Sequence, residues 1–138
     1  MALHLVKLCV GVSEVAELRQ WVRDARKGLD TLDHVTRMWP RREDEILPGG
    51  SLYWVMRGMI TCRMPIQAFE KVRGRDGVER CRIVFKPRVV AVRPMPRRAF
   101  QGWRYLEADD APPDLKKGEV PDGMSEAMRR ELAALGLL

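Results

Sequence analysis

The sequence predicts an α+β domain built on a strongly bent, mostly antiparallel sheet or a small pseudo-barrel, with an N-terminal helix and a C-terminal helix. Strand-like alternation is dense from 51 to 105, whereas 13–28 and 125–135 show helical spacing. A chain of 138 residues can bury one ordinary core. We therefore expect a single domain over 1–106, followed by an acidic linker with Pro and Gly and a C-terminal helix over 107–138.

The first elements are a strand and a helix. A strand is expected over 2–10, where one of the two alternating faces is mostly apolar. Ser13 is a suitable N-cap, because its hydroxyl can accept a hydrogen bond from a free amide of the first helical turn. An apolar stripe then recurs every three or four residues up to Gly28, a typical C-terminal stop. This helix is expected to pack on the sheet.

Short elements lead to what we interpret as the central strand. A strand is expected over 35–39, a short turn of helix over 41–47 and a tight turn at 48–50. The alternation over 52–62 is clear and is interrupted only at Gly58. A long strand with a missing side chain at its middle indicates a bulge or bend, as curved sheets and small barrels require.

A hairpin follows the central strand. Asp76-Gly77 predicts a tight turn between strands over 66–73 and 78–86, because these residue types support positive backbone φ angles. A further strand is expected over 88–92, after Pro87. The prolines and glycines of 108–123 indicate a linker or surface loop before the final helix.

The net charge of +6 is concentrated in one block of the chain. Residues 51–105 carry thirteen basic residues, eleven of them arginine, against three acidic ones, for a balance of +10. Residues 1–50 are neutral and 106–138 return −4. Such a block repels itself unless it faces solvent, acidic segments or an anionic ligand. A solvated surface, contact with nucleic-acid phosphates and neutralisation by the acidic tail all remain open.

The register of the hairpin decides what its charges do. A two-residue loop puts Arg73 opposite Arg80 and gathers the hairpin cations on one face, which like-charge repulsion disfavours unless the face meets water or phosphates. A three-residue loop over 75–77 puts Arg73 opposite Glu79 instead, so that the charges largely satisfy one another. Both loops are common, and a basic stripe is therefore a hypothesis.

A second candidate region interleaves cations with aromatic residues over 96–105. This combination can hold phosphates and stack unpaired bases. The alternative is that Phe100, Trp103 and Tyr105 are core anchors for the end of the domain, with Arg104 stacked on a ring, which the burial preference of aromatic residues favours. The segment 35–42 presents a weaker version of the same pattern.

These patterns favour a non-catalytic nucleic-acid-binding module, with RNA as the first candidate ligand. The expected contacts are the cations of the hairpin and of the second region, with two aromatic rings: Lys71, Arg73, Arg80, Arg82, Arg97, Arg98, Trp103, Arg104 and Tyr105. The runner-up is a protein-interaction or scaffold module that uses arginine and aromatic anchors. The third hypothesis is an enzyme that acts on a nucleobase or small anion in a cavity.

Several other classes lack support in the sequence. The three cysteines and two histidines show no paired short spacing of the zinc type, and no motif of a nucleophile or phosphate-cradling loop is present. We therefore expect no metal and no cofactor. The apolar runs are far shorter than the ~20 residues of a spanning helix, and the N-terminus does not resemble an export signal. A cytoplasmic location is expected, with RNA, another polyanion or a protein as partner and no membrane.

Three segments of the chain resemble a bacterial family known as domain of unknown function 1489. They are HVTRMWP at 34–40, GGSLYWV at 49–55 and FQGWRYL at 100–106, and the opening 3–11 fits as well. The resemblance implies a soluble single-domain bacterial protein and carries no catalytic residue or cofactor. A looser similarity, through the Gly-Gly turn, the break at Gly58 and the hairpin, is to small RNA-binding barrels of the pseudouridine-synthase and archaeosine-transglycosylase type. It implies a pseudo-barrel whose rim holds RNA or a modified base.

Overall fold

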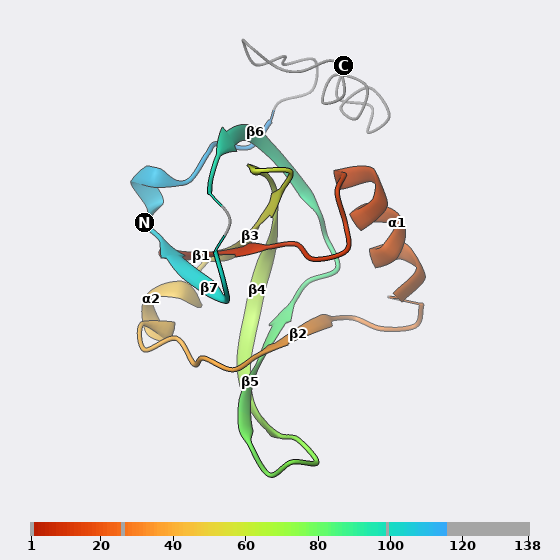
Figure 1. Ribbon diagram of the computed structural model, residues 1–138, viewed down its shortest axis with the longest axis vertical. Coiled ribbons are helices and arrows are strands. Elements are labelled where there is room, and N and C mark those ends of the chain that lie inside the picture. Colours follow the sequence, from red (N-terminus) through yellow and green to blue (C-terminus); the bar gives the residue numbers. More distant parts are fainter. Residues whose placement is uncertain (1, 26, 99, 116–138) are drawn as a thin grey trace.

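The computed structural model describes residues 2–25, 27–98 and 100–115 (Figure 1). Its elements follow one another in the order β1 (His4–Leu8), α1 (Val15–Ala25), β2 (Leu32–Thr36), α2 (Glu43–Ile46), β3 (Ser51–Met56), β4 (Met59–Arg73), β5 (Glu79–Phe85), β6 (Val90–Pro96), β7 (Trp103–Leu106) and η1, a 3₁₀ turn (Ala108–Asp110). The described part of the chain is therefore dominated by strands.

These strands form a mixed sheet, so the predicted fold class was wrong. The described residues contribute seven strands in the order β2-β5-β4-β3-β1-β7, with β6 pairing β4 beside that path. β1 runs parallel to β3, and the other ladders are antiparallel. A parallel pair needs a long crossover between its strands, and here the crossover contains α1, β2 and α2.

The sheet is not closed into a barrel. β2 and β7 lie at the two ends of the path and form no ladder with each other in the described part of the chain. The chain after β2 contacts β7 through side chains instead. Trp103 Nε1–H donates to Met38 O at 2.9 Å, and the Tyr105 hydroxyl accepts the Arg42 N–H at 3.3 Å. A barrel requires a continuous backbone ladder at this junction, which these contacts replace.

The two α-helices of the described residues are short. α1 has 11 residues and buries Val15, Leu18 and Val22, which is the predicted apolar stripe. α2 has only 4 residues. The helix expected over 125–135 lies outside the described residues. Figure 1 shows α1 beside the sheet rather than capping an end of it.

The strand expected over 52–62 is a hairpin. β3 ends at Met56 and β4 begins at Met59, and the two residues between them both have positive φ angles, 53° at Arg57 and 75° at Gly58. Two successive positive angles are the geometry of a two-residue I′ turn, which Asn-Gly usually signals. Arginine is an uncommon first residue for such a turn, and the sequence therefore gives the appearance of one continuous strand.

The sheet separates two apolar clusters, because alternate residues of β3 point to opposite faces. Leu52 and Trp54 belong to the larger cluster, with the buried face of α1. Tyr53 and Val55 belong to the smaller cluster, which Phe100 joins from the segment between β6 and β7. Ile83 and Phe85 of β5 also belong to the larger cluster, and the loop end of the β4–β5 hairpin projects at the bottom of Figure 1.

Candidate functional site

The β4–β5 hairpin has the three-residue loop of the two alternatives. Gly74 N–H donates to Val78 O at 3.1 Å, which leaves 75–77 as the loop. Arg73 consequently lies opposite Glu79. The hairpin therefore takes the register in which opposite charges meet across the strands.

This register divides the predicted hairpin cations between two faces. Lys71 and Arg73 share a face with Glu79, whose carboxylate lies 3.8 Å from Lys71 Nζ and 3.7 Å from Arg73 Nη2. Arg80 and Arg82 lie on the opposite face, because successive strand residues alternate. The four cations do not form the single basic stripe that the other register would have produced.

The cations on the second face are also paired. Arg80 Nη2 lies 2.7 Å from Asp76 Oδ2. The hydrogen bonds from the Arg80 guanidinium and, to a smaller extent, from the Val78 N–H lower the pKa of Asp76 to about 2. Arg82 Nη1 lies 3.3 Å from Glu70, and its Nε lies 2.9 Å from Asp33 without hydrogen-bond geometry. Each of the four predicted hairpin cations thus lies beside a carboxylate.

Trp103 and Tyr105 serve as anchors of β7. Trp103 is 4% exposed, and its indole N–H is bonded to Met38 O. The Tyr105 ring packs edge-on against Trp103 with centroids 4.9 Å apart, and the Arg42 guanidinium lies 5.4 Å from its centroid. Trp103 therefore has no open face for a base, and Tyr105 is covered on one side.

Two of the three remaining candidates lie over one aromatic ring. The guanidinium carbons of Arg97 and Arg104 lie 5.3 and 5.2 Å from the centroid of Phe100. Arg98 follows Arg97 directly in the chain and is exposed. None of the three arginines forms an ion pair with a carboxylate of the described residues. We call Arg97, Arg98 and Arg104, with Phe100, the arginine cluster.

The arginine cluster is held in place by the fold. Phe100 packs against the smaller apolar cluster, and Arg97 N–H donates to Gly58 O at 2.9 Å in the β3–β4 turn. Arg104 Nη1 donates to the Gln101 and Trp103 carbonyls at 2.8 and 3.0 Å. These contacts fix the backbone and one guanidinium while leaving the charges without a carboxylate partner within the described chain.

The residues after β7 neutralise other arginines. Asp114 accepts two hydrogen bonds from Arg63, both 2.8 Å long, and they lower the pKa of Asp114. Glu107 pairs with Arg42 at 2.9 Å. Part of the acidic tail therefore folds back on basic residues, as one of the three charge hypotheses expects, and the pairs it forms lie outside the arginine cluster.

A comparison with models of known protein families shows to which family the chain belongs. The family model described as "Protein of unknown function (DUF1489)" matches residues 5–138. The chain belongs to this family. No curated protein and no solved structure gives a significant match. The resemblance of the three sequence segments to this family is thereby confirmed.

The three segments that carry this resemblance meet in the fold. Met38 of the first segment accepts the indole hydrogen bond from Trp103 of the third. The second segment contains β3, which pairs with β1, and β1 in turn pairs with β7. The Ser51 N–H also donates to His4 Nδ1 at 3.0 Å, which ties the start of β3 to β1. These residues therefore hold the sheet together.

The described residues contain no helix with the length and apolar character needed to cross a membrane.

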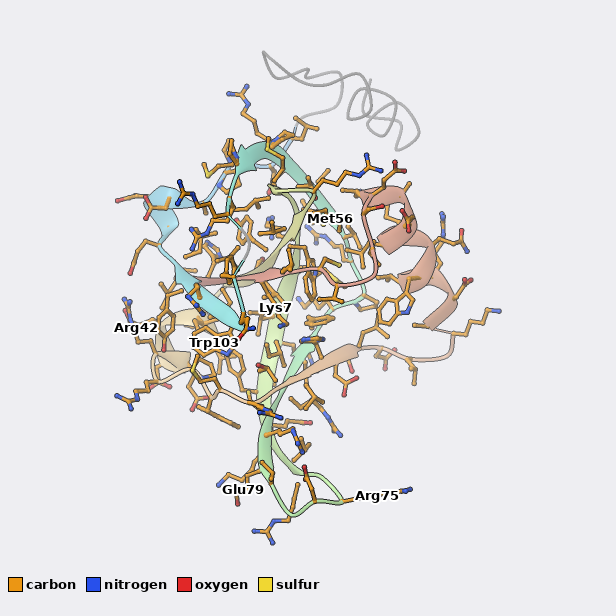
Figure 2. All side chains as sticks on the ribbon, viewed as in Figure 1. Lys7, Arg42, Met56, Arg75, Glu79 and Trp103 are labelled. Carbon is orange, nitrogen blue, oxygen red and sulfur yellow. The ribbon has the colours of Figure 1, made fainter. Side chains whose placement is uncertain are left out.

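Figure 2 shows Arg75 and Glu79 at the far end of the hairpin, well away from Trp103 on β7. The predicted contact surface combined residues of the hairpin with residues of the segment after β6. These two regions are thus separate parts of the molecule.

Proposed function

We propose that this protein is a nucleic-acid-binding module, with RNA as its first candidate ligand, that receives the phosphate backbone on the arginine cluster. The observation that supports this function is the placement of Arg97 and Arg104 around Phe100 without a carboxylate partner in the described chain. Guanidinium groups recognise phosphate through planar, two-pronged hydrogen bonding. They also offer flat surfaces on which unpaired RNA bases stack.

Preorganisation strengthens this proposal. A guanidinium held over a ring loses less side-chain freedom when a ligand binds than a free surface arginine does. The hairpin cations are different, because a phosphate would have to compete with Glu79, Asp76 or Glu70 for each of them. The proposed contact surface is therefore the arginine cluster, without the hairpin.

The test is RNA binding across a salt series. A mixed-sequence single-stranded RNA, labelled for fluorescence anisotropy, is titrated with wild-type protein and with a triple variant, Arg97→Gln, Arg98→Gln and Arg104→Gln. Each phosphate contact contributes about −0.7 to the slope of log K against log salt for single strands. We expect the triple variant to weaken binding and to reduce the magnitude of the slope by about 2.

The matched control neutralises two hairpin cations, Lys71→Gln and Arg73→Gln, and should leave the slope nearly unchanged. Thermal unfolding verifies that each variant is folded. The proposed function is refuted by undetectable binding of the wild type at low salt. It is also refuted by a hairpin variant that loses as much affinity as the triple variant.

A further inference from the structure

A separate pocket lies between α1 and the larger-cluster face of the sheet. Its volume is about 270 Å³, at the small end of the range for ligand sites. Leu18 and Trp21 of α1 form one wall, and Trp54, Met64 and Phe85 come from the strands. The pocket is thus lined mainly by apolar and aromatic side chains.

Two basic side chains, one from β1 and one from β2, also line this pocket. Lys7 lies on β1, near the centre of the view in Figure 2, and His34 lies on β2. Burial lowers the pKa of both side chains, and the charge of Lys7 further lowers the pKa of His34. Their cationic forms are therefore disfavoured in the pocket unless a negative charge joins them.

Lys7 has no such charge within the described part of the chain. Asp33 contributes a carboxylate to the pocket lining, where it partly offsets the lowering of the His34 pKa, but it is also engaged by Arg82, with Nε 2.9 Å from Oδ2. No ion pair of Lys7 is formed by the described residues. An anionic group in the pocket would provide the missing counter-charge.

A residue that lines the pocket also carries an unpaired hydrogen-bond donor. Trp54 is 6% exposed, and its Nε1–H is covered by the surrounding atoms without a hydrogen-bond partner in the described residues. Buried polar groups are nearly always paired, so this indole would gain from an acceptor that reached it from the pocket. The His34 ring packs edge-on against the Trp54 ring with centroids 5.7 Å apart, so two aromatic rings form this part of the pocket wall.

We infer that this pocket binds a small, flat, mainly apolar molecule that carries one anionic group, such as an aromatic carboxylate. The aromatic body packs against Trp54 and Phe85, while the anionic oxygen atoms meet the ammonium group of Lys7. This site is independent of the arginine cluster, because Trp54 belongs to the larger apolar cluster and Phe100 to the smaller one.

The test compares benzoate with benzamide, a neutral molecule of nearly the same shape. Calorimetric titration of the full chain should give at least tenfold tighter binding of benzoate. Lys7→Met should remove that preference while retaining weak benzamide binding, and Lys71→Met, outside the pocket, should change neither. In NMR spectra, the Trp54 indole N–H signal should shift with benzoate, whereas that of Trp103, already bonded to Met38, should not.

Equal affinity for the two probes would overturn the inference, as would the absence of binding by either at millimolar concentration. A Trp54 indole signal that does not move on benzoate addition would do the same. The NMR and probe comparisons use the wild type, so they decide the question even if Lys7→Met does not fold.

Discussion

Single residues determine which of the predicted contacts are available. Trp103 fits two interpretations in the sequence, base stacking or core anchoring, and the structure places it as an anchor. Its partner, the Met38 carbonyl, is 65 residues away in the chain, so local pattern could not identify the contact. Burial preference pointed in the right direction, because large aromatic residues usually lie inside.

Lys7 illustrates what the sequence did not reveal. It lies between Leu5 and Cys9 on the face of β1 that belongs to the larger apolar cluster. A lysine at such a position is a usable signal, because lysine is seldom buried without a partner. The pocket around it could not be predicted, since its walls come from a helix and several strands that are distant in sequence.

The Asp76–Arg80 pair predicts a specific acid titration. The pKa of Asp76 falls from its ordinary 3.8 to about 2 in the fold, mainly through hydrogen bonds from Arg80. Since the folded pKa lies below the unfolded one, this carboxylate stabilises the protein above about pH 4. That contribution is lost as the pH falls through about 2.

Side-chain NMR titration measures this shift directly. We expect a midpoint near 2 for the Asp76 carboxyl and a return toward 3.8 in Arg80→Gln, with part of the shift retained because the Val78 N–H still donates. Lys71→Gln on the other hairpin face is the matched control and should leave the midpoint unchanged. A wild-type midpoint near 3.8 would show that the pair does not hold in solution.

Among the secondary-structure elements, the turn at Arg57 and Gly58 caused the largest difference between the predicted and the observed strands. A single strand would place Ile60 on the same face as Trp54. The structure instead places Ile60 with Tyr53 and Val55, because the two-residue turn pairs Ile60 with Val55. A register shift between Trp54 and Val55 then brings Cys62 opposite Trp54. The alternating pattern identified the residues of both strands, but it could not locate a turn that lacks the usual residues.

The start of β3 depends on Gly50. A Cβ atom there would lie closer to the Ile46 carbonyl oxygen than real contacts allow, and this oxygen accepts the Gly50 N–H at 2.7 Å. Because the neighbour is backbone, it cannot move aside easily. Gly50→Ala should therefore lower the free energy of unfolding by about 1 to 3 kcal/mol.

Urea unfolding provides the measurement for Gly50→Ala. Gly28→Asn is the control, because Gly28 has a positive φ of 74° that asparagine tolerates and open space around it. We expect that control to change the stability little. A Gly50→Ala protein as stable as the wild type would refute the close approach of the two backbone segments.

At the scale of the whole molecule, contacts between segments far apart in the sequence determine features that the sequence alone left undecided. The hairpin and the first helix were predictable because their signals are local. The parallel β1–β3 pair was not, because it depends on a crossover of more than forty residues. The block of positive charge was visible in the sequence, but its division between ion pairs and the arginine cluster follows from the register and the tertiary contacts.

The central claim is that the arginine cluster, and not the hairpin, receives the polyanion. Amide and arginine side-chain NMR signals of isotope-labelled protein, recorded while single-stranded RNA is added, locate the contact directly. We expect shifts centred on Arg97, Arg98 and Arg104, with 74–78 of the hairpin loop unaffected. Shifts centred on the hairpin, or none anywhere at low salt, would contradict it.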